Sequence, residues 1–242
     1  YCAETFKANH PNTDLIVRDI CNISAKNLPT VDILTGGFPC QPFSIAGYRK
    51  GFDDERGNLF FHIIRLLKEF QNENRLPKII FLENVKNLYS HNNGETYKIV
   101  REELNNLGYY VTEKILNTYE YGNIPQNRER LYIIAFLNEQ QKNNFIWPNK
   151  IKLTNTIDNL IDWNNDVDKK YYYTSKMKCY PLLSEHMENN HSIYQFRRVY
   201  IRENKSGVCP TLTANMGMGG HNVPLIKDSK GRIRKLTPRE CL

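Results

Sequence analysis

Two kinds of hydrophobic pattern alternate along the first 136 residues of the chain. Between residues 59 and 70 apolar side chains recur every three to four positions, which predicts an amphipathic helix. A second pattern of this kind covers 96–107 and ends at Gly108. Short apolar runs bounded by turn residues predict buried strands at 31–34, 78–84, 109–116 and 131–136. The alternation predicts an α/β fold with a doubly wound, Rossmann-like sheet whose strands are mostly parallel.

The N-terminal residues carry two shorter patterns. Residues 1–8 have helical spacing, and 15–17 is a β-branched run that predicts a strand with Asp19 at its carboxyl end. The first residue is Tyr1 and not Met, and Leu242 follows what reads as the first turn of a helix. We therefore expect the chain to be a fragment that is cut within structure at both ends.

The character of the sequence changes after residue 136. Asn, Gln and Lys dominate to about residue 170 and the alternation of strands and helices is lost, which predicts a domain boundary near Trp147. Beyond it, 223–226 is typical of a strand and Lys230-Gly231-Arg232 of a hairpin turn. We expect a first domain at 1–147 and a smaller, β-rich or irregular region at 148–233. Residues 234–242 are expected to start a C-terminal helix that returns to the first domain.

Composition narrows the possible partners and the setting. The 242 residues carry a formal net charge of +7, which favours an anionic partner. Nucleic acid is the leading candidate, and a merely basic soluble enzyme is the alternative. The six cysteines form no Cys-x-x-Cys pair and follow no secretory segment, so we expect a reduced, cytoplasmic protein. We expect no membrane span, because no apolar run approaches the roughly 20 residues that a bilayer requires.

One thiol and three charged side chains are predicted at the same edge of the sheet. Cys40 follows a strand and a Gly-Gly turn, Glu83 ends the next strand, and Arg128 and Arg130 precede a later one. Ligands of open α/β sheets bind just past the carboxyl ends of the strands. Such a site suits an electron-poor heterocycle such as cytosine. The thiolate would add to the ring, the carboxyl would share a proton with a ring nitrogen, and a guanidinium would hold a carbonyl.

Each of these side chains also has an ordinary structural interpretation. Cys40 by itself could be a small apolar residue in a loop. Glu83 could be a cap or a surface ion-pair partner, and Arg128 and Glu129 could form a solvated pair. A Cys–His hydrolase is a further alternative that would use His62 or His91. Neither histidine lies at a predicted strand end, which counts against that chemistry.

Four ordered blocks of the sequence carry a resemblance to a known family. They are Gly36-Gly37-Phe38-Pro39-Cys40-Gln41-Pro42-Phe43-Ser44, Glu83-Asn84-Val85, Gln126-Asn127-Arg128-Glu129-Arg130 and Arg234-Lys235-Leu236-Thr237-Pro238-Arg239-Glu240-Cys241. Together they resemble the signature blocks of the DNA (cytosine-5) methyltransferases of bacterial restriction-modification systems. The resemblance runs to about Phe136 and resumes at the last block. It implies a methyltransferase sheet at 1–147 and a target-recognition domain at 148–233.

The resemblance implies a sequence-specific DNA methyltransferase. It would transfer a methyl group from S-adenosylmethionine to carbon 5 of a cytosine flipped out of duplex DNA. Cys40 would attack carbon 6 and form a covalent adduct, Glu83 would hold the exocyclic amine and ring nitrogen 3, and Arg130 would bind the carbonyl. Arg128 would orient the loop or a phosphate. The glycine-rich, basic segment 41–57 would be a mobile lid over the flipped base, although its composition also fits a surface loop.

The resemblance also implies the residues that bind the cofactor and the DNA. Asp19 would receive the adenine amino group of S-adenosylmethionine, Ile20 would stack beside the ring, and Phe38, Pro39 and Leu59 would line the pocket. Ile20 and Leu59 would serve equally well as core residues, and no metal is expected. Contacts to double-stranded DNA are expected from Gln41, Ser44, Arg49, Arg56, Arg197, Arg198, Thr211 and Leu212.

Some blocks of the family have no match in this sequence, and two alternatives stay open. The N-terminal glycine block, the acidic residue for the ribose and the last C-terminal block are missing, so we expect this fragment alone to bind S-adenosylmethionine poorly and to be inactive. The full-length enzyme is expected to be a monomer. The alternatives are an RNA (tRNA) cytosine-5 methyltransferase of the same family and a catalytically silent DNA-binding module, or half of a split enzyme. The variable region argues for DNA, and Cys40 and Glu83 count against a purely binding role.

Overall fold

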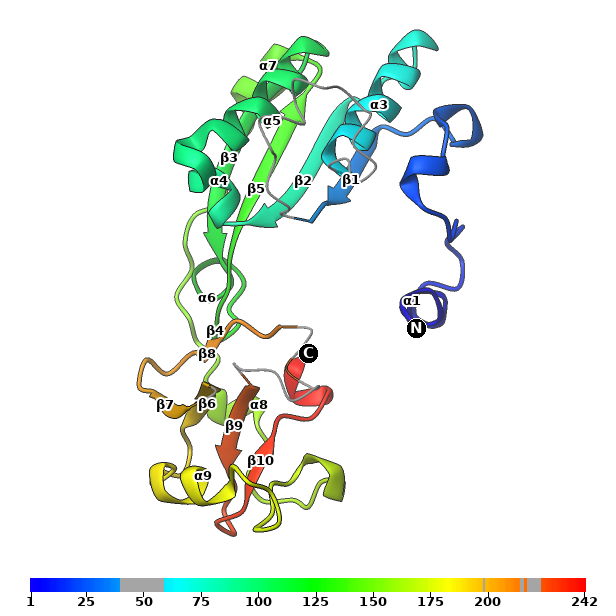
Figure 1. The fold of residues 1–242 in the computed structure, drawn as a ribbon. Helices are drawn as coiled ribbons and strands as arrows, with labels where there is room; N and C mark the ends of the chain where they lie inside the picture. The colour runs from blue at the N-terminus through cyan, green and yellow to red at the C-terminus, as the bar shows by residue number, and fades with distance from the viewer. Residues whose placement is uncertain (40–58, 198, 214–215, 217–222) are drawn as a thin grey trace. The chain divides into compact units, whose positions relative to one another are not determined.

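The computed structural model describes residues 1–39, 59–197, 199–213, 216 and 223–242 (Figure 1). Contacts divide the chain into two compact units. The first unit holds Tyr1–Ile115 and Arg130–Ile146, and the second holds Leu116–Glu129 and Trp147–Leu242. Several predicted site residues lie outside the described residues, as does the segment 41–57: Cys40, Gln41, Ser44, Arg49, Arg56 and Arg198.

A four-stranded sheet forms the centre of the first unit, with the strand order β1-β2-β5-β3 that can be followed in Figure 1. β1 and β2 pair in parallel, so that Gly37 lies opposite Glu83 at the carboxyl end of both strands. The four predicted strands are all present. Their bounds are Ile33–Gly37 for β1, Ile79–Val85 for β2, Tyr110–Asn117 for β3 and Glu129–Phe136 for β5.

The mixed α/β class is confirmed, with one difference in strand direction. β5 runs antiparallel to β2, where mostly parallel strands were expected. Between β3 and β5 the chain has only the four-residue helix α6 (Thr118–Tyr121) and the short strand β4 (Gln126–Asn127). A parallel strand needs a crossover of about a dozen residues or more, usually a helix that packs on the sheet. Without such a helix after β3, the chain turns back along the sheet.

Helices α3 (Leu59–Asn72) and α5 (Glu95–Asn106) lie beside each other and share a core with the sheet. Both agree with the predicted helical periods to within one or two residues. Their apolar rows pack against Leu82 of β2 and Ile133 of β5, which are fully buried. Shorter helices are α4 (Asn87–Ser90), η4 (His91–Gly94) and α7 (Glu139–Asn144). In the part of the chain that the structure describes, no helix has both the length and the apolar character to cross a membrane.

The N-terminal segment agrees with the sequence prediction only in part. The predicted helix is present as α1 (Cys2–Asn9), but 15–17 forms no strand and Val17 is exposed. No strand among the described residues pairs with this run, and a β-branched run becomes a strand only where a neighbour satisfies its backbone. Asp19 therefore does not end a strand but caps the 3-10 turn η1 (Ile20–Asn22), which η2 (Ala25–Asn27) follows.

The second unit is rich in β-structure, as the sequence predicts. An antiparallel sheet has the order β10-β9-β6-β7, and a separate parallel pair joins β4 to β8. The predicted hairpin turn is confirmed: Gly231 has φ +77° between β9 and β10, a conformation that glycine adopts without strain. The bounds are Ile193–Arg197 for β6, Tyr200–Asn204 for β7, Cys209–Pro210 for β8, Val223–Lys227 for β9 and Ile233–Lys235 for β10. The helical turns are α8 (Ile157–Leu160), η5 (Lys169–Tyr171), α9 (Tyr180–His186) and η7 (Arg239–Cys241).

The two units divide the chain differently from the expected ranges at two places. Residues 116–129 belong to the second unit, because their strand β4 pairs with β8. Residues 234–242 also belong to it, because β10 pairs with β9. The assignment of 1–147 to catalysis and 148–233 to target recognition stays a prediction.

Candidate active site

The carboxyl ends of β1 and β2 are joined by a buried side chain. Asn84, at 2% exposure, donates a hydrogen bond from Nδ2 to the carbonyl oxygen of Phe38 at 2.9 Å. Its Oδ1 accepts the backbone N–H of Val85 at 2.8 Å. The chain that leaves β1 is therefore fixed against β2 at Phe38, two residues before Cys40.

Glu83 and Arg130 form an ion pair at this same edge of the sheet. Arg130 Nε lies 2.9 Å from Glu83 Oε1, and the side chains are 16% and 36% exposed. The other carboxylate oxygen faces the end of β1, since a Cβ added at Gly37 would lie 3.7 Å from Oε2. The carboxylate thus lies between a guanidinium and the strand that leads to Cys40. The predicted proximity of Glu83 to Arg130 is present in the structure.

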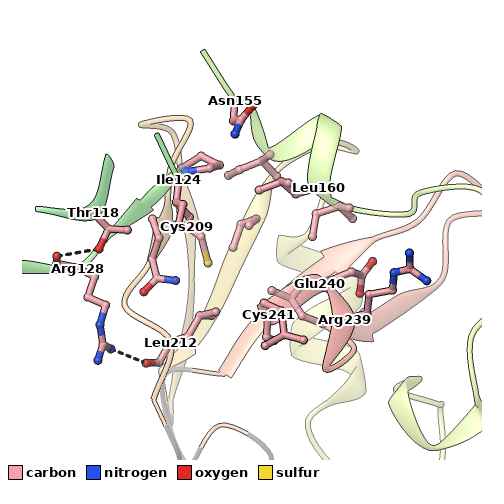
Figure 2. Close-up of a pocket in the computed structure, with 17 residues that line it drawn as sticks. Thr118, Ile124, Arg128, Asn155, Leu160, Cys209, Leu212, Arg239, Glu240 and Cys241 are labelled. Atoms are coloured by element: carbon pink, nitrogen blue, oxygen red, sulfur yellow. Dashed lines mark hydrogen bonds between the residues drawn. The ribbon is translucent and has the colours of Figure 1, made fainter. Parts of the chain in front are cut away.

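Arg128 belongs to the second unit and has different neighbours. Its backbone N–H donates to Asn117 Oδ1 at 3.0 Å. Its Nη1 donates a long hydrogen bond to the carbonyl oxygen of Leu212 at 3.5 Å, which Figure 2 shows as a dashed line. Thr211 Oγ1 donates to the carbonyl oxygen of Asn127 at 2.7 Å. The predicted DNA-contacting pair 211–212 is therefore attached to the block 126–130, a connection that the sequence does not indicate.

Arg128 and Leu212 border a cavity of about 410 Å³ within the second unit, shown in Figure 2. Its lining is mainly apolar and includes Leu160, Cys209 and Cys241.

Arg197, another predicted DNA contact, lies on β6 and donates from Nη2 to Gln195 Oε1 at 3.3 Å. Arg197 is thus partly engaged within its own strand.

A cavity of about 340 Å³ in the first unit collects the predicted cofactor residues. Four of the five predicted side chains line it: Ile20, Phe38, Pro39 and Leu59. Asp19 directly precedes Ile20 in the chain. The remaining lining residues were not predicted to bind the cofactor, although two of them continue the helical row of Leu59: Leu34, Thr35, Gly36, Gly37, Ile63 and Leu66.

Asp19 is an exposed carboxylate that the backbone holds in its charged form. Its Oδ1 accepts the N–H of Cys21 at 2.9 Å, and this hydrogen bond, with the Cys21 thiol as a second donor, lowers the pKa of Asp19 below its usual value. Asp19 is therefore an available hydrogen-bond acceptor next to the cavity at neutral pH.

Three of the described cysteines are poor candidates for a nucleophile. Burial raises the pKa of Cys209 to about 12, and burial together with Glu240 raises the pKa of Cys241. A hydrogen bond with Asp19 raises the pKa of Cys21. Because the thiolate is the reactive form, these thiols stay neutral and weakly nucleophilic at pH 7.

The fold and this site define a class of protein. An α/β sheet carries a Glu–Arg pair at the carboxyl end of one strand and an apolar cavity at the end of the next. The chain belongs to the family of C-5 cytosine-specific DNA methylases, which matches residues 1–242. It is a methyltransferase of the restriction-modification type, which confirms the family and the enzyme class that the sequence blocks indicate.

Individual relatives agree with this assignment. The chain is 52% identical over 241 residues to the Type II methyltransferase M.Bsp6I of Bacillus sp. (strain RFL6), with 99% of this chain and 74% of the relative covered. It is 37% identical over 238 residues to the Type II methyltransferase M.HhaI of Haemophilus parahaemolyticus, with 92% and 67% covered. The crystal structure of S. pombe Dnmt2 methyltransferase superposes with a TM-score of 0.67 at 22% identity over 98% of this chain and 73% of that one. At that identity the likeness concerns the fold alone.

Proposed function

We propose that the protein is a sequence-specific DNA methyltransferase that transfers a methyl group from S-adenosylmethionine to carbon 5 of a flipped-out cytosine. The observation that carries the proposal is the Glu83–Arg130 ion pair at 2.9 Å, beside the strand that leads to Cys40. The family description, C-5 cytosine-specific DNA methylase, supports double-stranded DNA as the substrate. The bacterial Type II relatives support an enzyme that acts on DNA in a bacterial cytoplasm. A monomeric full-length enzyme is part of the proposal.

The base site would work through Cys40, Glu83 and Arg130. The Cys40 thiolate forms a bond to carbon 6 of the cytosine, while Glu83 shares a proton with ring nitrogen 3 and Arg130 holds the carbonyl oxygen. Electron density then moves to carbon 5, which becomes the nucleophile for the methyl group. The methyl donor would leave as its neutral thioether. A water molecule would accept the proton from carbon 5, and the electrons of that C–H bond would expel the Cys40 thiolate from carbon 6 and restore the aromatic ring.

The 340 Å³ cavity fits the nucleoside part of the cofactor. Its volume is in the range of small-molecule sites, and its apolar lining suits an adenine ring. Asp19 stays charged and can accept a hydrogen bond from the exocyclic amine. When bound, S-adenosylmethionine supplies a methyl group on a positively charged sulfonium. Phe38 lines the cavity and is hydrogen-bonded to Asn84, the neighbour of Glu83, so the cofactor and the base would meet at one edge of the sheet.

The second unit would supply the contacts that read the DNA. Arg128 donates a hydrogen bond to Leu212, and Thr211 donates one to Asn127, the neighbour of Arg128. Arginine and threonine side chains are donors that contact phosphates and base edges in complexes with DNA. The lid segment 41–57 would cover the flipped base, whose unstacking costs a few kcal/mol. Gln41, Ser44, Arg49, Arg56, Arg197 and Arg198 are proposed as further DNA contacts.

Methyl transfer by the full-length protein tests this function. With labelled S-adenosylmethionine we expect label in 5-methylcytosine of duplex DNA and none in tRNA, and bisulfite sequencing then identifies the target sequence. Label in tRNA alone would favour the RNA-modifying alternative. DNA binding without any transfer would support the silent-module alternative, and label on the exocyclic amine would contradict the carbon-5 assignment.

A further inference from the structure

The segment 19–25 has little secondary structure of its own, although it carries two residues of the proposed cofactor site. Its backbone forms only the short turns η1 and part of η2. Ile20 lines the 340 Å³ cavity and Asp19 directly precedes it. Because so few backbone hydrogen bonds lie within the segment, contacts to other elements determine where Asp19 and Ile20 lie.

Arg65 of α3 makes the main polar contacts to this segment. Its Nη2 donates to the carbonyl oxygen of Ile20 at 2.9 Å and to that of Ile23 at 2.8 Å. Its Nη1 donates to Glu69, one turn along the same helix. A planar guanidinium can hold two carbonyls and a carboxylate at once, which the single ammonium group of lysine cannot do with the same geometry.

Glu69 adds a second attachment point for the segment. Its Oε2 accepts the hydroxyl of Ser24 at 2.8 Å and the N–H of Ala25 at 2.7 Å. Burial alone would raise the pKa of Glu69, but these two donors and Arg65 lower it below the usual value. The carboxylate is therefore charged at neutral pH, so the Arg65–Glu69 pair can hold both ends of the segment.

The same helix also lines the cavity from another side. Leu59, Ile63 and Leu66 recur at helical spacing and border the cavity, whereas Arg65 and Glu69 lie on the adjacent face and contact the segment 19–25. One helix thus positions both sides of the proposed adenine subsite. Any change that releases the segment from α3 alters the cavity without touching Glu83 or Arg130.

We propose that Arg65, supported by Glu69, is a positioning residue that fixes Asp19 and Ile20 for binding of the cofactor's adenine ring. The inference rests on the proposed use of S-adenosylmethionine. Arg65 itself has no role in the chemistry at the base. Its loss is therefore expected to weaken cofactor binding selectively, while the turnover rate at saturating cofactor and the affinity for DNA stay unchanged.

The test compares Arg65→Ala with Lys68→Ala in the full-length protein. Alanine is a strong helix former, so α3 is expected to persist in both variants. We expect the Kd for S-adenosylhomocysteine by calorimetry, and the KM for S-adenosylmethionine, to rise by about 10- to 100-fold in Arg65→Ala. Lys68 is a matched control on the same helix, since its side chain is largely exposed and lies 3.8 Å from Glu103. Lys68→Ala should leave both constants unchanged.

Two further variants separate positioning from helix stability. Arg65→Lys keeps the positive charge but replaces the planar guanidinium by a single ammonium group. Its Kd for S-adenosylhomocysteine is expected to lie between those of the wild type and Arg65→Ala. An exchanged pair, Arg65→Glu with Glu69→Arg, restores the ion pair but not the carbonyl contacts, and should stay defective. Full recovery by the exchange, a fall in kcat instead of a rise in KM, or wild-type affinity in Arg65→Ala would overturn the proposal. If the wild-type protein binds no cofactor, the proposed function fails instead.

Discussion

Replacement of Arg130 by alanine is expected to lower kcat for methyl transfer by about 10²- to 10³-fold. Arg130 Nε lies 2.9 Å from Glu83 Oε1, and the guanidinium is mostly shielded from water. The change removes the proposed donor to the cytosine carbonyl and leaves the Glu83 carboxylate without this partner. Both losses affect the state in which charge develops on the ring, so the effect should appear in kcat and not in the KM for the cofactor.

Two variants control this result. Glu83→Gln keeps the shape of the side chain but cannot share a proton with ring nitrogen 3, and is expected to reduce kcat by about 10²- to 10⁴-fold. Arg101→Ala removes an exposed arginine of the same unit, 3.8 Å from Glu113, and should leave kcat unchanged. Pre-steady-state methyl transfer at saturating DNA and cofactor gives the rate of the chemical step. An Arg130→Ala protein with wild-type kcat would contradict the proposed base site.

Replacement of Arg234 by methionine is expected to destabilise the second unit by about 3–5 kcal/mol. Arg234 is fully buried, and its Nη1 and Nη2 donate to both oxygens of Glu240 at 2.8 and 2.7 Å. Nη2 also donates to the carbonyl oxygen of Asp162 at 2.7 Å. Removing the guanidinium leaves the Glu240 carboxylate, 5% exposed, as an unpaired buried charge. Breaking such a pair costs far more than the pair itself contributes.

Urea unfolding followed by tryptophan fluorescence measures this effect, because both tryptophans, Trp147 and Trp163, belong to the second unit. The double variant Arg234→Met with Glu240→Leu should recover most of the loss, since no unpaired charge remains. Lys230→Ala breaks the exposed pair with Asp166 in the same unit and should cost at most about 1 kcal/mol. An equal decrease in the free energy of unfolding in Lys230→Ala and Arg234→Met would contradict the claim that burial of the Arg234–Glu240 pair makes its loss costly.

The same buried pair predicts how the second unit responds to acid. Burial by itself would raise the pKa of Glu240, but Arg234 and the N–H of Thr237 lower it below the usual 4.5. A carboxyl whose pKa is depressed in the folded state contributes stability above its unfolded pKa and loses it as the pH falls through the folded value. The contribution of Glu240 is therefore complete at neutral pH and is lost only below about pH 4.

Much of the first unit could be predicted because the hydrophobic residues of its helices and strands recur in clear patterns. The helix α3 follows from its apolar row, and β2 from an apolar run that ends on Glu83. The direction of β5 could not be predicted, because it depends on the absence of a crossover helix. The run at 15–17 has the β-branched composition of a strand, but no strand among the described residues pairs with it. Its preference for extended structure therefore did not produce a strand.

The site could be predicted only where a residue type itself indicates the chemistry. Glu83 and Arg130 were expected together at one sheet edge, and the structure joins them. Asn84, Arg65 and Glu69 act through backbone carbonyls and N–H groups of distant segments, and such contacts leave no periodic signal in a sequence. The attachment of Leu212 to Arg128 depends on the pairing of β4 with β8, which two-residue strands do not reveal in advance.

The central claim is that Cys40 forms a covalent bond to the target cytosine, and covalent trapping tests it most directly. The full-length protein would be incubated with S-adenosylmethionine and duplex DNA whose target cytosine carries fluorine at carbon 5, which cannot leave as a proton does. We predict a stable protein–DNA adduct that peptide mass spectrometry assigns to Cys40. Cys40→Ser should abolish it, and Cys209→Ser, whose thiol has a pKa raised by burial, should not. An adduct that survives in Cys40→Ser would contradict the account.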